Sequence, residues 1–179
     1  MQNRHFGSEV TPMSGFWSNI FLSNPKKDST LDLLKTIPVF EDLNSRELQA
    51  VERILYRRTF SPGEIIFRQG DPGVGMYMLG EGEVEIRSEP DHVVLTTLGV
   101  GSFFGEVSLL NEVPRSATAA ASTECVLWGF FRPELMDLIE RRPKLGVKIL
   151  LHLAQIAGKR LVAVDVELRD MRIRDSEVR

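Results

Sequence analysis

Apolar residues begin to recur at helical spacing near residue 32, after a polar start to the chain. A short helix is expected first, and Pro38 interrupts it because proline lacks the backbone N–H that a helix needs. Asn44 or Ser45 then caps a second helix, predicted to run to about Tyr56 with Glu47 in its first turn. The apolar face of this second helix is formed by Leu48, Val51, Ile54 and Leu55.

Between residues 57 and 131 the pattern changes to short apolar runs separated by turn residues. The turns hold the Gly, Pro, Ser and Asp residues that tight reversals use, as in Ser61-Pro62-Gly63 and Gly80-Glu81-Gly82. The runs cover residues 59–60, 64–67, 76–79, 84–86, 93–98, 117–121 and 125–131. Many short strands at this spacing are typical of a small antiparallel barrel or jelly roll.

Two helices are predicted at the end of the chain. Pro133 opens a short helix that extends to about Arg141, and Pro143 begins a long one. Apolar residues of the long helix alternate at steps of three and four over about three and a half heptads. We call these residues the seam: Val147, Leu150, Ala154, Ala157, Leu161, Val164, Leu168 and Met171. The first half of the seam could pack on the strands, whereas the second half predicts a homodimer, with fraying of the last ten residues as the alternative.

Composition and charge exclude several classes of protein. The net charge of −3 over 179 residues argues against a basic surface for nucleic acid. The lone Cys125 excludes an internal disulfide and favours a reducing, cytoplasmic location, and its apolar neighbours predict a buried side chain. His5, His92 and His152 are too scattered to suggest a metal site. No run approaches the ~20 apolar residues of a membrane span.

Residues 1–30 are interpreted as an extension that is partly disordered or docks elsewhere, because Pro12 and Pro25 interrupt it without sustained periodicity. Its apolar run, residues 15–22, is expected to dock on the protein's own surface or on a partner. Membrane contact is not expected, although two lysines follow the run. The predicted organisation is therefore this extension, a strand-rich unit over residues 31–142 and the long helix over residues 143–179.

Residues 103–117 combine groups that a small anionic ligand carrying a hydroxyl would need. Gly105 leaves room for a ligand against the main chain, and Glu106 can accept a hydrogen bond from the hydroxyl. Arg115, nine residues after Glu106, offers a cationic fork for a phosphate. The short helical turn between them supplies free N–H groups and the positive end of a dipole. A Glu and an Arg at this spacing can also form a surface pair of little energy, but such a pair requires neither Gly105 nor Pro114.

The run Gly105-Glu106-Val107-Ser108-Leu109-Leu110, followed by Pro114-Arg115-Ser116-Ala117-Thr118, resembles the phosphate-binding cassette of the cyclic nucleotide-binding domain family. The resemblance extends over roughly residues 37–161. It implies that Glu106 holds the ribose 2′-hydroxyl, that Arg115 pairs with the cyclic phosphate, and that the short helix between them contributes N–H groups. The ligand-binding residues expected on this basis are Gly105, Glu106, Val107, Ser108, Arg115, Ser116 and Ala117.

The resemblance also implies the fold class and the ligand. It implies an α+β fold, an antiparallel β-roll (jelly roll) of about eight strands with a short N-terminal helix, a cassette helix and two C-terminal helices. Cyclic AMP is expected because Arg115-Ser116-Ala117 resembles the pattern of bacterial cyclic AMP receptors, with a cyclic GMP-selective receptor as the alternative. In the family a residue of the long helix caps the base; Arg160 is the candidate here, and Lys159 and Gln155 are alternatives.

The expected function is that of a sensor that signals to an unidentified protein partner through the long helix. The competing hypothesis is a ligand-free β-roll interaction module, against which the intact Glu106 and Arg115 argue. No nucleophile–base pair or metal set accompanies the cassette, so neither catalysis nor a catalytic cofactor is expected. Residues 172–179 are charged and sparse in apolar side chains, and no DNA-reading segment follows, so no specific nucleic-acid binding is expected.

Overall fold

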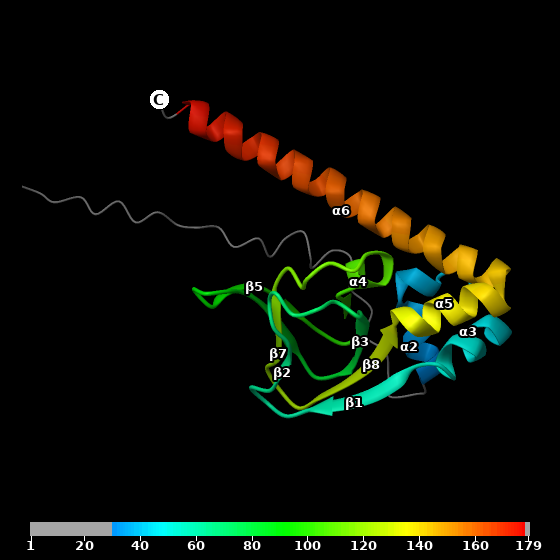
Figure 1. The fold of residues 1–179 in the computed structure, drawn as a ribbon. Helices are drawn as coiled ribbons and strands as arrows, with labels where there is room; N and C mark the ends of the chain where they lie inside the picture. The colour runs from blue at the N-terminus through cyan, green and yellow to red at the C-terminus, as the bar shows by residue number, and fades with distance from the viewer. Residues whose placement is uncertain (1–29, 178–179) are drawn as a thin grey trace, which may run out of the picture.

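The structure, a computed structural model, describes residues 30–177 (Figure 1). The predicted extension, with its apolar run, lies outside the described residues. The elements in chain order are α2 (Thr30–Thr36), the 3₁₀ turn η1 (Pro38–Phe40), α3 (Ser45–Glu52), β1 (Tyr56–Phe60), β2 (Ile65–Phe67), β3 (Gly75–Glu81), β4 (Val84–Ser88), β5 (Val93–Leu98), β6 (Phe103–Phe104), α4 (Val107–Leu110), β7 (Thr118–Ala121), β8 (Cys125–Phe131), α5 (Arg132–Arg141) and α6 (Pro143–Glu177).

The strands form two antiparallel sheets of four strands each, which roll around a shared interior. The strand order is β1-β8-β3-β6 in the first sheet and β2-β7-β4-β5 in the second. With the α-helices at both ends of the chain, this confirms the predicted α+β fold and its β-roll. The sequence pattern did not predict β6 as a strand; its two residues pair with Tyr77 and Met78 of β3.

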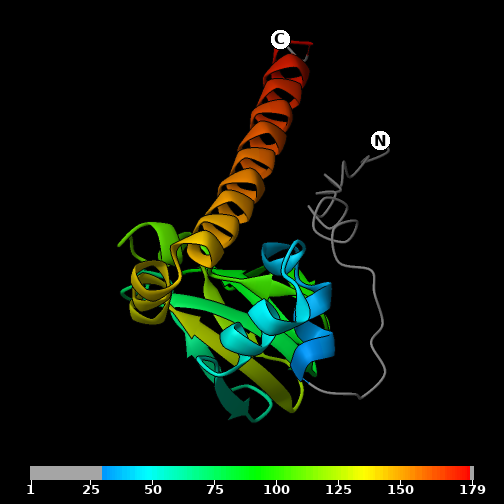
Figure 2. The same ribbon diagram turned by 90° about the vertical axis from the view of Figure 1, so that its right-hand side faces the viewer.

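Side chains alternate along the first sheet between two apolar cores, because successive residues of a strand point to opposite faces. Met76 and Met78 of β3 pack against the helices, whereas Tyr77 and Leu79 point into the roll. Cys125 of β8, 2% exposed, joins the inner core, which confirms its prediction as a buried residue. The helices α2, α3, α5 and α6 therefore cover one face of the first sheet (Figures 1 and 2).

The helix α3 begins as predicted but ends earlier. The Asn44 side chain accepts hydrogen bonds from the main-chain N–H groups of Arg46 and Glu47, and Glu47 accepts one from the Asn44 N–H, which completes a capping box. The predicted helix end at Tyr56 is wrong, because α3 stops at Glu52. Tyr56 instead begins β1, where it pairs with a residue of β8. Strand pairing over the whole of β1 outweighs the local helical spacing.

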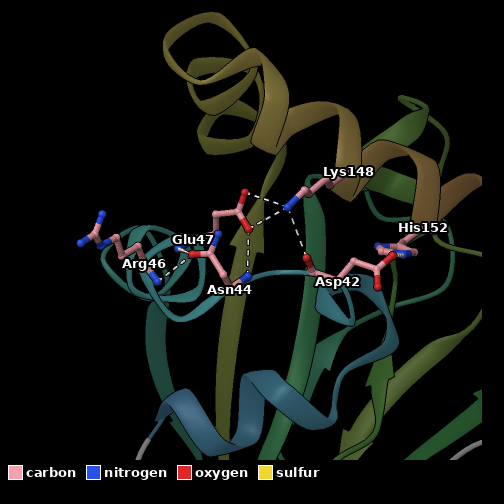
Figure 3. A network of polar contacts seen from close by, with 6 residues as sticks. All are labelled: Asp42, Asn44, Arg46, Glu47, Lys148 and His152. Atoms are coloured by element: carbon pink, nitrogen blue, oxygen red, sulfur yellow. Dashed lines mark hydrogen bonds and ion pairs between the residues drawn. The ribbon is translucent and has the colours of Figure 1, made fainter.

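An ion pair and a histidine–carboxylate contact join this capped end of α3 and the residues just before it to α6 (Figure 3). Lys148 Nζ donates to both carboxylate oxygens of Glu47 at 2.9 Å and to the Asp42 carbonyl oxygen at 3.3 Å. One turn further along α6, His152 Nε2 lies 3.1 Å from Asp42 Oδ2. We call these contacts the clasp; they tie the first half of α6 to the segment between η1 and α3.

The long helix α6 packs on the rest of the protein mainly with a face other than the seam, although Leu150 of the seam is partly buried against the same core. Leu145, Ile149 and Leu153 are buried in the core between the first sheet and the helices, whereas Val147 of the seam is 60% exposed. Two residues of an α-helix correspond to about 200° of rotation, so Val147 points away from the face that Leu145 buries. In Figure 2 the second half of α6 extends away from the β-roll. None of the helices within residues 30–177 is long and apolar enough to cross a membrane.

Candidate functional site

A cavity of about 360 Å³ lies between the β-roll, the cassette turn α4 and the second half of α6. Its walls come from segments that are far apart in the sequence: β2, β4, β5, the run from Phe104 to Ser108, the run from Val113 to Ala117, and α6. All of the residues predicted from the cassette line it, together with the proposed base cap: Gly105, Glu106, Val107, Ser108, Arg115, Ser116, Ala117 and Arg160. The fold therefore brings the whole predicted set to one hollow.

Arg115 is a buried cation on the wall of this cavity, with only 6% of the residue exposed. Its Nη1 donates to the Gly105 carbonyl at 3.1 Å and to Ser108 Oγ at 3.0 Å. Its guanidinium carbon lies 4.1 Å from the centre of the Phe67 ring, a cation–π distance. Nε makes no hydrogen bond, and no ion pair within residues 30–177 includes Arg115. Burial lowers the pKa of this guanidinium, and the nearby Tyr77, Glu106 and Asp71 partly offset that effect.

The backbone of Arg115 is fixed by the loop that follows β2. Its N–H donates to the Asp71 carbonyl at 2.9 Å, and its carbonyl accepts from the Gly70 N–H at 2.9 Å. Next to this pair, Pro72 and Pro114 form an isolated β-bridge. These contacts set the direction of the Arg115 side chain, which therefore enters the cavity from a rigid main chain.

Gly105 has a structural role that differs from the expected one. Its φ is +78°, and a Cβ atom built there would lie 2.4 Å from Arg115 Nη1. The absence of a side chain thus makes room for the arginine that Gly105 itself holds through its carbonyl, in a backbone conformation that favours glycine. The arginine, rather than a ligand as expected from the sequence, therefore occupies that space.

Glu106 and Arg160 form an ion pair across the cavity wall. Arg160 Nη1 donates to Glu106 Oε1, and the two side chains are 18% and 4% exposed, respectively. Glu106 belongs to the cassette and Arg160 to α6, so this pair connects the cavity to the long helix. The structure therefore places the predicted hydroxyl acceptor and the predicted base cap in direct contact.

The remaining walls are mainly apolar, and of their residues only Arg160 was predicted. Ile86 of β4 and Thr96 and Leu98 of β5 form one side. On the opposite side, α6 contributes residues spaced three and four apart, which share one face of a helix. These residues are Arg160, Ala163, Val164 and Glu167. The cavity thus has a charged end at Arg115 and Glu106 and a mostly apolar end between β5 and α6.

Phe67 is the most important contact that the sequence did not reveal. It lies 48 residues before Arg115. The centre of its ring is 6.2 Å from the ring centre of Tyr77 and 5.8 Å from that of Phe104. The Tyr77 and Phe104 rings therefore pack against the ring that lies beneath the guanidinium. Only the pairing of β2 with β7 brings Phe67 to this place, opposite Ala119, and no local motif encodes that pairing.

Within residues 30–177, no group of three or more His, Cys, Asp or Glu side chains is arranged to hold a metal ion. The buried polar groups on the cavity wall are instead one arginine, one carboxylate that is already paired, and the hydroxyl of Ser108; Thr96, Ser116, Arg160 and Glu167 also line the cavity. Such a set can bind an anion through Arg115 and a hydroxyl through Glu106, with a flat apolar group held at the other end.

Comparison with known proteins identifies the class to which this fold and site belong. The cyclic nucleotide-binding domain family matches residues 57–142. A putative potassium channel protein of Rhodopseudomonas palustris is 36% identical over 118 residues, which are 65% of this chain and 29% of the channel protein. The cyclic AMP receptor protein of Thermus thermophilus is 34% identical over 138 residues, 75% of this chain and 62% of the receptor.

A solved structure agrees with these sequence matches. The N-terminal domain of a transcriptional regulator from Streptomyces coelicolor superimposes with a TM-score of 0.67 at 30% identity, covering 74% of this chain and 94% of that domain. The chain belongs to the cyclic nucleotide-binding domain family. It spans less than two thirds of the length of both the channel protein and the receptor.

Proposed function

We propose that the protein is a regulatory sensor that binds a cyclic nucleotide, cyclic AMP, in the cavity described above and signals to a protein partner through α6. Membership of the family supports ligand binding. The relatives compared above are a channel, a receptor and a transcriptional regulator by name, so binding rather than catalysis is the activity we propose.

The single observation that carries the proposal is the state of Arg115. A buried charge without a counter-ion is costly, because removal from water is not repaid by a partner. The guanidinium donates hydrogen bonds to Gly105 and Ser108 and lies over the Phe67 ring, but its Nε makes no hydrogen bond. A phosphate entering the cavity would supply the missing negative charge and accept from the fork.

Glu106 and the apolar walls suggest how the rest of a nucleotide would lie. With its phosphate at Arg115, the ribose would face Glu106, whose Oε1 is engaged by Arg160. The base would then lie between β5 and α6, against Leu98 and Val164. A purine ring matches such a mainly apolar slot. The base cap by Arg160 stays a prediction, supported by its place on the cavity wall.

Ser116 does not discriminate between cyclic AMP and cyclic GMP, because a hydroxyl at this position suits either purine. Its hydroxyl lines the cavity beside Arg115, as expected for both ligand classes. The Arg115-Ser116-Ala117 pattern and the cyclic AMP receptor relative support cyclic AMP. Cyclic GMP is the competing ligand, and parallel titrations with the two nucleotides distinguish them.

Signalling is proposed to run through α6, with residues 31–142 as the ligand-binding unit and residues 143–179 as lid and output. Arg160 and Glu167 line the cavity, so the ligand would contact the same helix that carries the seam. A ligand that binds better to one position of α6 would shift the helix toward that position. The seam is proposed to form a homodimer, because Leu161 and Leu168 are 63% and 42% exposed.

The test is calorimetric titration of the full chain with cyclic AMP, cyclic GMP and AMP. We expect cyclic AMP to bind more tightly than cyclic GMP and far more tightly than AMP. Arg115→Ala should weaken cyclic AMP binding by about ten- to a hundred-fold, the equivalent of a lost charge-assisted hydrogen bond. Glu106→Ala should weaken binding less, because the ribose hydroxyl is neutral.

Arg68→Ala is the matched control for Arg115→Ala. Arg68 is exposed and belongs to the loop after β2 that bonds the Arg115 main chain, but it does not line the cavity. Its replacement should leave the affinity unchanged. Equal losses in the two arginine variants, or no heat with either cyclic nucleotide, would contradict the proposed function and favour a ligand-free interaction module.

A further inference from the structure

The cassette turn α4 is held at its carboxyl end by an arginine from a different element. Arg132 Nη1 donates to the carbonyl oxygens of Leu109 at 2.8 Å and of Leu110 at 3.1 Å. Its Nε lies 3.4 Å from Glu112 Oε1. The last carbonyls of a helix have no partner within the helix, and a positive charge is favourable there. One side chain therefore supplies both the donors and the charge that this end of α4 needs.

The main chain of Arg132 belongs to the unit formed by α5 and α6. It is the first residue of α5, although its N–H donates to the carbonyl oxygen of Val74, just before β3, at 2.9 Å, so the start of α5 is also bonded to the β-roll. The two helices touch closely, because a Cβ atom added at Gly146 of α6 would lie 2.5 Å from Ile139 of α5. Such close contact favours movement of α5 and α6 as one body. We call α5 and α6 together the α5–α6 body. Arg132 is the residue of this body that donates hydrogen bonds to the end of the cassette turn α4.

The other end of α4 is also attached to this body. Glu106, immediately before α4, pairs with Arg160 of α6. Between the two ends, the Leu109 side chain is fully buried in the same core as Leu135 of α5 and Ile149 of α6. The single turn of α4 therefore has an arginine from α6 at its start and an arginine from α5 at its end.

We infer that Arg132 is a positioning residue that transmits movement of the cassette turn to the α5–α6 body. The inference rests on the proposed function, because it is a nucleotide in the cavity that would act on α4. If α4 moves when the cavity fills, either α5 follows or the two hydrogen bonds from Arg132 Nη1 break. Lysine cannot replace this arrangement, because its ammonium is a point charge on a flexible stem rather than a planar fork.

The experiment places a reporter on α6 and measures binding independently of it. Val162 is 63% exposed and lies outside both the seam and the cavity lining, so Val162→Cys can carry an environment-sensitive fluorophore. Cys125, the single native cysteine, is buried and should not react. The parent protein, Arg132→Met and Arg132→Lys are compared in this background. Affinity comes from calorimetry with cyclic AMP, and coupling comes from the emission change at saturating nucleotide.

We expect both Arg132 variants to bind cyclic AMP within about ten-fold of the parent affinity. We also expect them to lose more than half of the emission change that saturating nucleotide produces. The matched control is Arg141→Met, which removes an arginine from the same helix. Arg141 makes only an exposed pair with Asp137, and its loss should leave the emission change intact.

Each other outcome overturns the inference in a recognisable way. Full emission changes in both Arg132 variants would show that Arg132 only stabilises the fold. So would a weakened affinity with an unchanged response at saturation. Nucleotide binding without any emission change in the parent would leave the proposed function standing but remove the coupling. An absence of binding in the parent would remove the proposed function itself. If circular dichroism shows that Arg132→Met does not fold, Arg132→Lys decides.

Discussion

At the scale of single residues, the cavity depends on how Arg115 is kept in place without a carboxylate. The Gly105 carbonyl and Ser108 Oγ accept its hydrogen bonds, and Phe67 lies under its plane. Two of these three partners belong to the cassette, within ten residues of Arg115. The cassette is therefore a scaffold for its own arginine as much as a set of ligand contacts.

Gly105→Ala should disturb this scaffold directly. The new methyl group would meet Arg115 Nη1 at 2.4 Å, and alanine is strained at a φ of +78°. We expect the free energy of unfolding to fall by about 1–3 kcal/mol and cyclic AMP affinity to fall at least about ten-fold. Urea unfolding and calorimetric titration measure the two effects.

Gly99→Ala is the matched control for this substitution. A Cβ atom added at Gly99 meets nothing within 4 Å, and its φ is not in the left-handed region. The free energy of unfolding and the cyclic AMP affinity of Gly99→Ala should stay close to those of the parent protein. If Gly105→Ala binds nucleotide as tightly as Gly99→Ala, Arg115 does not need the position in which the structure holds it.

The sequence could predict the polar residues of the cavity but not their neighbours, and the reason is distance along the chain. Glu106, Ser108 and Arg115 lie within one short segment whose local pattern is distinctive. Phe67 reaches the cavity only through strand pairing, and Arg132 reaches the end of α4, outside the cavity lining, only through helix packing. A side chain that contributes through long-range packing has no spacing or composition by which the sequence alone would reveal it.

At the scale of elements, the clasp between α3 and α6 is the main polar connection at the base of the long helix (Figure 3). Glu47 serves two elements at once, since it caps α3 through the Asn44 N–H and accepts two hydrogen bonds from Lys148 of α6. The bond from Lys148 is the main reason that the pKa of Glu47 is lowered, with the bond from the Asn44 N–H second. Loss of this carboxylate would therefore affect both elements.

Glu47→Gln should lower the free energy of unfolding at neutral pH by about 1–2 kcal/mol, because the cap and the ion pair are both weakened. Urea unfolding monitored by circular dichroism measures this change. Asp137→Asn removes an exposed ion pair within α5 and should change the free energy of unfolding much less, because water and salt screen such a pair. Equal losses in the two variants would mean that the clasp contributes no more than a surface pair.

The effect of Glu47 should also depend on pH in a defined direction. Because folding lowers the pKa of Glu47, its contribution is fully present above the unfolded-state pKa, which is about 4.3. The contribution disappears as the pH falls through the lower, folded-state pKa. The stability difference between the parent and Glu47→Gln should therefore shrink from pH 7 toward pH 3. A constant difference over that range would show that the charge of Glu47 is not what stabilises the clasp.

The elements with strong local signals were predicted well, and the errors lie where tertiary contacts decide. The start of α3 at Asn44, one of the two caps predicted, and the strand over residues 93–98 follow the sequence closely. The end of α3 and the two-residue β6 do not, because each depends on a partner strand distant in the sequence. The same holds for α6, whose buried face is set by its junction with α5 rather than by the heptad pattern.

At the scale of the whole molecule, the two sheets of the β-roll pair all eight strands of residues 30–177, but most of the seam on α6 stays exposed to solvent. Val147 and Ala154 of the seam are exposed where α6 packs on the body, and so are Leu161, Leu168 and Met171 beyond it. A row of exposed apolar side chains along one helix usually marks an interface. The heptad spacing favours a helix of a second copy as the partner, because antiparallel or parallel coiled coils bury such a row.

Two pairs of substitutions on the same stretch of α6 test this interface. Leu161→Glu with Leu168→Glu places charges in the seam, whereas Val162→Glu with Val166→Glu places them beside it at comparable exposure. Like charges facing each other across a helix pair oppose association, so only the first pair should convert a dimer into a monomer. Light scattering should give twice the chain mass of 20.2 kDa for the parent and the second pair. A parent that stays monomeric at about 100 μM, where interfaces of ordinary strength are occupied, would show that the seam serves a partner other than a second copy.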